Sequence, residues 1–178
     1  MKIIVVDDHA VVRNGIVELA HSEGFEVVGQ ADNKESAISM IAAKNPDVVT
    51  VDLSLPDGNG LEIVRWARKL KPNLGIVVLS IYDDDTNLLA SMSAGASAFI
   101  SKGAPIDEIT NAIVASYKSP MSFTSKGLVR AVRTKRDQAG LTTRELEILS
   151  MLPTGLIGEE IAKKLFITTS TCLLYTSD

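Results

Sequence analysis

The sequence predicts an α/β protein, with a doubly wound five-stranded parallel sheet followed by a small all-α domain. Over about the first 118 residues, short apolar runs typical of buried strands alternate with helical patterns. The first, third and fourth runs are nearly unbroken Val, Ile and Leu, as expected of strands that helices cover on both faces. From residue 141 onward only helical patterns occur.

Five strands are predicted, and each is followed by a helical pattern. The apolar runs that predict the strands lie at residues 3–6, 25–29, 47–51, 75–80 and 97–101. After the third strand, Leu61, Val64 and Leu70 are spaced as one inward face of a helix. After the fifth strand, Ile106 and Ile113 mark a similar face. Right-handed crossovers place such helices on both sides of a parallel sheet.

Residues 119–140 lack a strong apolar pattern and are rich in basic side chains. The basic residues that precede the first acid of this segment are Lys126, Arg130, Arg133, Lys135 and Arg136. We interpret 119–140 as a basic linker between a domain of residues 1–118 and a domain of residues 141–178. The first 118 residues contain 10 Lys and Arg against 16 Asp and Glu, and the remainder contains 8 against 6. This asymmetry favours two domains with different partners.

Residues 141–178 have the outline of a helix-turn-helix. Thr142 and Glu145 fit a capping box at the start of a first helix. A second helix is predicted at residues 159–166, and Thr168 is expected to cap a third. Two short helices followed by a capped third are typical of this DNA-binding arrangement.

Composition excludes several other classes of protein. The chain has 178 residues, a net charge of −4 and one cysteine, Cys172, so an internal disulfide and a cysteine-based zinc site are both excluded. No apolar run approaches the ~18 residues that a membrane span requires. The N-terminus lacks the long apolar stretch and the cleavage site of a signal peptide. We therefore expect a cytoplasmic protein with no membrane partner.

Polar side chains are predicted to meet at the carboxyl edge of the sheet. The residues that follow or end the first, third, fourth and fifth strands are Asp7, Asp8, Asp52, Ser80 and Lys102. In a doubly wound sheet the carboxyl ends of the strands form the binding edge. Packed carboxylates repel one another unless a cation lies between them. Because Mg²⁺ prefers oxygen ligands, the pattern predicts a Mg²⁺ site.

The same residues predict phosphoryl-transfer chemistry. A carboxylate such as that of Asp52 can attack phosphorus and form an aspartyl phosphate. A metal ion and a lysine such as Lys102 neutralise the charge of the phosphoryl group during transfer. One hydroxyl and one lysine beside three carboxylates therefore suit a site that receives a cation and an anion together.

Four motifs in the first domain are Val-Asp-Asp-His at 6–9, Val-Asp-Leu-Ser-Leu-Pro-Asp-Gly-Asn-Gly at 51–60, Val-Leu-Ser at 78–80 and Ala-Phe-Ile-Ser-Lys at 98–102. With these motifs, residues 2–117 resemble the receiver domain of response regulators of the NarL/FixJ type. The resemblance implies a flavodoxin-like fold. It also implies that Asp52 is the phosphoacceptor and that Lys102 pairs with the phosphate. Asp8, with Asp7 beside it, looks like the Mg²⁺ acid, and the backbone carbonyl of Ser54 would be a further ligand.

The resemblance also implies a conformational switch. Ser80 resembles the switch hydroxyl of the family, and Phe99 resembles the switch aromatic residue. A sensor histidine kinase is then the expected phosphodonor, and phosphorylation is expected to favour a homodimer. The protein is expected to be no enzyme beyond Mg²⁺-dependent self-phosphorylation and self-dephosphorylation.

Three motifs in the second domain are Leu-Thr-Thr-Arg-Glu-Leu-Glu-Ile-Leu at 141–149, Gly-Leu-Ile-Gly-Glu-Glu-Ile-Ala at 155–162 and Leu-Phe-Ile-Thr-Thr-Ser-Thr at 165–171. They resemble the LuxR-type helix-turn-helix, which implies transcription regulation through DNA binding. The residues expected to contact DNA are Thr169, Ser170, Thr171, Lys163 and Lys164.

This second resemblance has two departures. Ile157 stands where the family has a polar cap, and no Lys or Arg follows Lys164. Phosphate contacts from basic side chains supply much of the affinity for DNA. We therefore expect a domain that is incomplete at its C-terminus, with compromised DNA binding.

Two other functions fit parts of the sequence. The chain could be a receiver that acts by protein–protein contact, with a non-functional DNA-binding remnant. It could also be an enzyme, either an aspartyl-phosphate hydrolase or a nucleotide binder. The hydrolase would require an acid where Ser54 stands, and the nucleotide binder would require a glycine-rich loop where the chain has residues 7–10.

Overall fold

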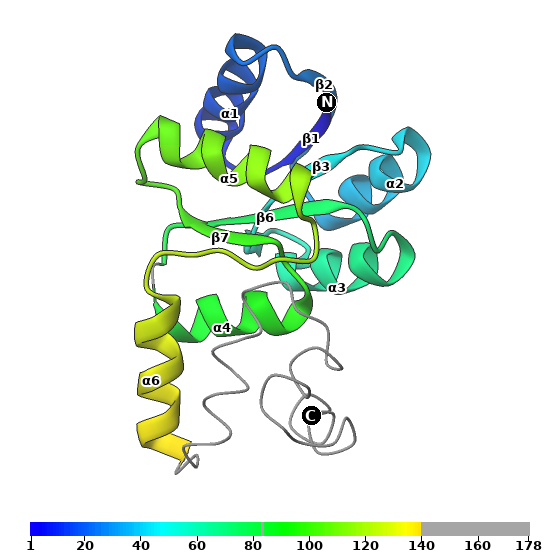
Figure 1. Ribbon diagram of the computed structural model, residues 1–178. Helices are drawn as coiled ribbons and strands as arrows, with labels where there is room; N and C mark the ends of the chain where they lie inside the picture. The colour runs from blue at the N-terminus through cyan, green and yellow to red at the C-terminus, as the bar shows by residue number, and fades with distance from the viewer. Residues whose placement is uncertain (83, 140–178) are drawn as a thin grey trace.

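The computed structural model describes residues 1–82 and 84–139, and its centre is a five-stranded parallel sheet with the strand order β2-β1-β3-β6-β7 (Figure 1). The strands are β1 (Lys2–Val6), β2 (Glu26–Ala31), β3 (Val48–Asp52), β6 (Gly75–Ser80) and β7 (Ala98–Ser101). All neighbouring strands in this sheet pair in parallel. The predicted doubly wound sheet is confirmed, although β2 and β3 end slightly later than expected.

Five helices cover the two faces of this sheet: α1 (Ala10–Ser22), α2 (Lys34–Lys44), α3 (Gly60–Leu70), α4 (Asp85–Ala94) and α5 (Ile106–Lys118). Helices α1 and α5 pack on one face, and α2, α3 and α4 pack on the other. In the part of the chain that the structure describes, no helix has the length and apolar character that crossing a membrane requires.

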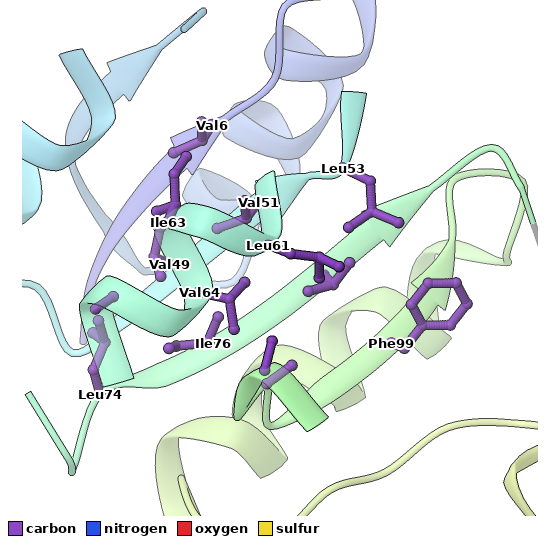
Figure 2. Packing of buried hydrophobic residues seen from close by; sticks show 14 of the residues in the cluster. Val6, Val49, Val51, Leu53, Leu61, Ile63, Val64, Leu74, Ile76 and Phe99 are labelled. Atoms are coloured by element: carbon purple, nitrogen blue, oxygen red, sulfur yellow. The ribbon is translucent and has the colours of Figure 1, made fainter. Parts of the chain in front are cut away.

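The two faces of the sheet form two apolar cores, because successive strand residues point in opposite directions. Ile3 and Val5 of β1 contact the α1 and α5 side, and Ile4 and Val6 contact the α2–α4 side. Figure 2 shows the second core, in which the strands pack against α3. Burial of each such side chain contributes about 1.5–3 kcal/mol to folding.

Two apolar residues do not face the core as predicted. Leu70 and Ile106 are both exposed, whereas Leu61, Val64 and Ile113 are buried. Leu70 is the last residue of α3 and Ile106 is the first of α5. The predicted helical faces are therefore correct along the helices and wrong at these two ends.

A short antiparallel pair follows β3, in place of the expected loop. Its strands are β4 (Ser54–Leu55) and β5 (Gly58–Asn59). The carboxylate of Asp57, in the turn between them, accepts hydrogen bonds from the backbone nitrogens of Lys34 (2.7 Å) and Glu35 (3.0 Å) at the start of α2. These bonds lower the pKa of Asp57. The turn that follows Asp52 is thus tied to the neighbouring helix.

The segment interpreted as a linker contains a helix, α6 (Leu128–Ala139), which packs on α4 (Figure 1). Leu128, Ala131 and Val132 are buried and belong to the same core as α2–α4. Their spacing of three and four residues places them on one face of the helix. The predicted basic linker therefore contains a helix that packs on the first domain, because a narrow apolar face lies among its basic residues.

The chain between α5 and α6 runs along the edge strand β7. The backbone nitrogen of Phe99 donates to the carbonyl of Thr124 (3.1 Å), and the nitrogen of Thr124 donates to the carbonyl of Ser97 (2.9 Å). The carbonyl of Pro120 accepts hydrogen bonds from the Ser97 hydroxyl (2.6 Å) and the Arg68 guanidinium (2.9 Å). An edge strand otherwise leaves a row of unpaired backbone groups, and this segment satisfies part of that row.

Candidate functional site

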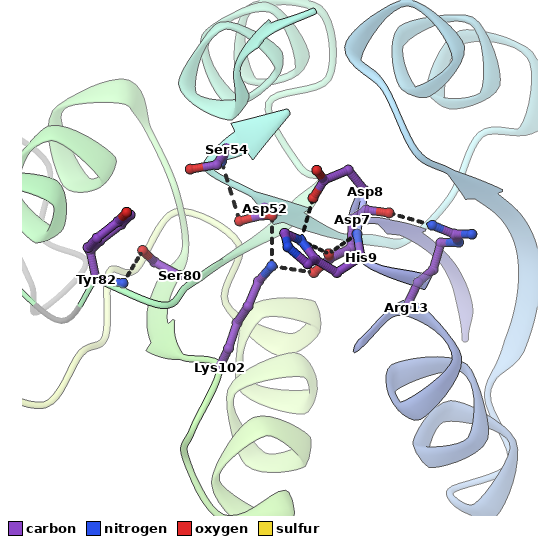
Figure 3. A network of polar contacts seen from close by, with 9 residues as sticks. All are labelled: Asp7, Asp8, His9, Arg13, Asp52, Ser54, Ser80, Tyr82 and Lys102. Carbon is purple, nitrogen blue, oxygen red and sulfur yellow. Dashed lines mark hydrogen bonds and ion pairs between the residues drawn. The ribbon is translucent and has the colours of Figure 1, made fainter. Parts of the chain in front are cut away.

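The polar residues predicted to meet do lie together at the carboxyl edge of the sheet (Figure 3). Asp7 follows β1, Asp52 ends β3, Ser80 ends β6 and Lys102 follows β7. Asp7 and Asp52 are only 1% and 3% exposed, so their charges require partners inside the protein. The topology of the sheet, and not proximity in sequence, builds this site.

Lys102 holds the two buried carboxylates together. Its Nζ atom lies 2.7 Å from Oδ2 of Asp7 and 2.7 Å from Oδ2 of Asp52. Burial raises the pKa of the Asp52 carboxyl, and the opposing hydrogen bond from Lys102 does not reverse this. Burial alone would lower the pKa of Lys102, but its bonds to Asp52 and Asp7 outweigh this effect and raise the pKa. The ammonium group therefore stays charged at neutral pH.

Ligand atoms for a divalent cation surround the same point. Asp7, Asp8, His9 and Asp52 each offer one donor atom, and these atoms all lie within 4.8 Å of one another. Asp8 is paired with His9, whose Nδ1 atom lies 2.6 Å from Oδ1 of Asp8. Three carboxylates with a single lysine suit a hard divalent cation. The donor set therefore fits the predicted metal.

The backbone around Asp52 is closely packed. Oδ1 of Asp52 accepts a hydrogen bond from the backbone nitrogen of Ser54 (3.3 Å). The nitrogen of Gly60 donates to the carbonyl of Leu53 (2.8 Å), and a Cβ atom at position 60 would lie 2.0 Å from the carbonyl oxygen of Asp52. The last glycine of the 51–60 motif is therefore required by a backbone contact. The role of the Ser54 carbonyl as a metal ligand stays a prediction.

The two residues expected to form the switch lie on the next two strands of the sheet, Ser80 at the end of β6 and Phe99 in β7. Ser80 is buried, and its hydroxyl oxygen accepts a hydrogen bond from the backbone nitrogen of Tyr82 (3.0 Å). Phe99 is buried in the α2–α4 core, to which Phe123 and Leu128 of the following segment also belong. Their roles in switching stay predictions.

Arg13 is a site residue that the sequence did not reveal. Its guanidinium donates to the backbone carbonyl of Asp7 (2.7 Å), and its backbone nitrogen donates to the carbonyl of His9 (2.9 Å). The sequence signals only the backbone contact with His9, because Arg13 follows His9 by four residues, about one helical turn. It gives no signal for the contact between the guanidinium and the Asp7 carbonyl. The residues expected to contact DNA lie at 163–171, outside the described residues.

A parallel sheet with this strand order and a buried Asp–Lys–Asp centre at its carboxyl edge defines the receiver class of α/β domain. The family model of the response regulator receiver domain matches residues 3–114, and the model of the LuxR family of bacterial regulatory proteins matches residues 139–178. The chain belongs to the response regulators, with a receiver domain and a LuxR-type DNA-binding domain.

Curated relatives match nearly the whole chain. The DNA-binding transcriptional activator DevR/DosR of Mycobacterium tuberculosis is 33% identical over 99% of this chain and 85% of its own length. The response regulator GacA of Pseudomonas aeruginosa is 33% identical over 98% and 86%. These matches confirm the predicted family, the NarL/FixJ-type response regulators, and the predicted class of function, transcription regulation in two-component systems.

Solved structures share the fold. A LuxR-family two-component response regulator from Aurantimonas sp. SI85-9A1 has a TM-score of 0.69 at 28% identity, covering 76% of this chain and 97% of the other. The RcsB response regulator of Salmonella typhimurium has a TM-score of 0.67 at 25% identity, covering 98% and 87%. The receiver fold predicted from the sequence is confirmed.

Proposed function

We propose that this chain is a phosphorylation-dependent transcription regulator that acts in the cytoplasm. Asp52 accepts a phosphoryl group from a sensor histidine kinase, and the C-terminal domain then binds DNA. The observation that carries the proposal is the buried Lys102 ammonium, which lies 2.7 Å from both Asp7 and Asp52. Such a centre is built to hold negative charge on both sides of a single cation.

The residues of the site have separate tasks in the transfer. A carboxylate oxygen of Asp52 attacks phosphorus, so that a P–O bond forms while the P–N bond to the kinase histidine breaks and that imidazole recovers a proton. Lys102, already beside Asp52, pairs with an oxygen of the transferred phosphoryl group. Asp8, Asp7, Asp52 and the carbonyl of Ser54 would hold a Mg²⁺, which would neutralise further phosphoryl charge.

In this proposal Ser80 transmits the presence of the phosphoryl group to the rest of the domain. Its hydroxyl oxygen accepts a bond from Tyr82, which leaves the hydroxyl hydrogen free to donate to a phosphoryl oxygen. A shift of Ser80 would pull the chain that leads into α4, and α4 carries α6. Phosphorylation thereby changes how α6, the helix that leads to the second domain, packs on α4.

In the same proposal, the change at α6 releases the second domain from the first, and this release favours pairing of two chains. A structure of two RcsB dimers bound to two parallel DNAs supports a dimeric, DNA-bound form for this relative. We propose the same oligomeric form for the phosphorylated chain. Pairing lets two half-site contacts reinforce each other.

DNA footprinting of the chain on its own upstream region, with and without acetyl phosphate, tests this function. Because no Lys or Arg follows Lys164, we expect only weak protection, which strengthens on phosphorylation and is absent from Asp52→Asn. Phosphorylation without protection of any DNA would contradict the proposal. That outcome would instead support a receiver that acts through protein–protein contact.

A further inference from the structure

A nitrogen donor lies beside the carboxylates of the proposed metal site. Nδ1 of His9 lies 2.6 Å from Oδ1 of Asp8 and 3.7 Å from Oδ1 of Asp7. Figure 3 shows the imidazole ring beside Asp7 and Asp8. His9 thus belongs to the cluster by geometry, although the proposed phosphorylation does not use it.

The backbone fixes His9 in this place. Its nitrogen donates to Oδ1 of Asp7 (2.9 Å), and its carbonyl accepts from the nitrogen of Arg13 in the first turn of α1. His9 is the N-cap residue of α1, yet its side chain makes no capping hydrogen bond. The usual structural reason for a polar side chain at a helix start is therefore absent, and the ring is directed at the acids instead.

We infer that His9 is a ligand of the divalent cation and gives the site affinity for first-row transition metals such as Mn²⁺, beside Mg²⁺. The inference rests on the proposed metal site of the receiver. Two ligands on opposite sides of one ion, each at about 2.1 Å, are about 4 Å apart. The four donor atoms already lie within 4.8 Å of one another, so small side-chain rotations bring all of them to one ion.

The imidazole has the chemistry for this role. A neutral imidazole carries one N–H and one lone pair, so Nδ1 can exchange its contact with Asp8 for a bond to the metal while Nε2 carries the hydrogen. The side chain is 62% exposed, so the exchange requires no rearrangement of the core. Mg²⁺ gains little from a nitrogen ligand, whereas imidazole suits Zn, Cu, Fe and Ni, and Mn²⁺, the weakest-binding metal of that row, accepts a nitrogen beside its oxygen ligands.

The chain offers a matched control for the experiment. It has two histidines, and the other, His21, is exposed in the last turn of α1, away from the cluster. Mn²⁺ binding to the full chain is measured from the electron paramagnetic resonance of the free ion, and Mg²⁺ binding is measured by competition. Pulsed electron paramagnetic resonance then reports whether a ¹⁴N nucleus is coupled to the bound Mn²⁺.

We expect a ¹⁴N coupling in the wild type and in His21→Ala, and none in His9→Ala. Affinity for Mn²⁺ should fall about tenfold in His9→Ala, while affinity for Mg²⁺ changes less than about twofold. Tight binding of both metals without a ¹⁴N coupling would overturn the role of His9 and leave the proposed site intact. Equal losses for the two metals in His9→Ala would also overturn it. Failure of the wild type to bind either metal would contradict the proposed site itself and the inference with it.

Discussion

The carboxyl edge of the sheet and residues 119–139 belong to one packed structure, yet the sequence predicted the first much better than the second. At the edge, the residues that matter follow strands, and the topology of a parallel sheet fixes where strand ends lie. In the segment, the apolar residues Leu128, Ala131 and Val132 stand among basic ones. Their partner, α4, is defined only by the fold. The residues of the site can therefore be located from the predicted strands, whereas the packing of a peripheral helix depends on which element lies beside it in the fold.

The largest effect is expected from Gly60→Ala at the edge. The added methyl group would lie 2.0 Å from the backbone oxygen of Asp52, and no rotamer change relieves a contact with backbone. We expect destabilisation of more than about 4 kcal/mol, the upper end for single substitutions, in urea denaturation. Gly15→Ala is the control, because a Cβ there meets nothing within 4 Å and a helical alanine stabilises by about 0.5–1 kcal/mol. A loss under about 1 kcal/mol at Gly60 would show that the edge is less rigid than the structure indicates.

Much of the carboxyl edge could be predicted from the sequence, because its residues follow directly after predicted strands. Asp7, Asp52 and Lys102 had to converge once five parallel strands were assigned, and they do. The contact of Arg13 with the Asp7 carbonyl and the turn held by Asp57 could not be predicted. Both are bonds between a side chain and backbone of a distant or irregular segment, and residue type alone does not specify such a partner.

Lys102→Met tests whether the edge depends on its single cation. Loss of one partner of a buried ion pair leaves uncompensated charge, at a cost of about 3–5 kcal/mol at neutral pH. Because the folded state raises the pKa of Lys102, its contribution is complete below the unfolded value and is lost as pH rises through the folded pKa. The difference between wild type and variant in thermal or urea unfolding should therefore shrink above about pH 10.5. A difference that stays constant into that range would contradict the ion-pair account.

Leu128→Ala tests the other region. Leu128 is 8% exposed and belongs to the core, so its truncation should cost about 2–3 kcal/mol. Val129→Ala, next to it and 67% exposed, should change the free energy of unfolding by less than about 0.5 kcal/mol. Hydrogen exchange should also quicken in α4 only in the first variant. Equal, small effects of both changes would restore the interpretation of this segment as an independent linker.

The smallest effect is expected from the ion pair between α6 and α4. The Arg130 guanidinium lies 2.9 Å from Oδ1 of Asp85, and the arginine is largely exposed. Arg130→Asp and Asp85→Arg should each cost less than about 1 kcal/mol, and the double exchange should recover most of the loss. A double-mutant cycle in urea denaturation measures the coupling. If the double variant recovers no free energy of unfolding, the ion pair does not fix the position of α6 on α4.

The phosphorylation state of Asp52 tests the central claim most directly. The intact mass of the full chain is measured after incubation with acetyl phosphate and Mg²⁺, for the wild type and for Asp52→Asn. Asp57→Asn serves as a control, because Asp57 is the nearby carboxylate in the turn held by α2. We expect one phosphoryl group on the wild type and on Asp57→Asn, and none on Asp52→Asn. Undiminished labelling of Asp52→Asn, or none of the wild type, would contradict the assignment of Asp52 as the phosphoacceptor.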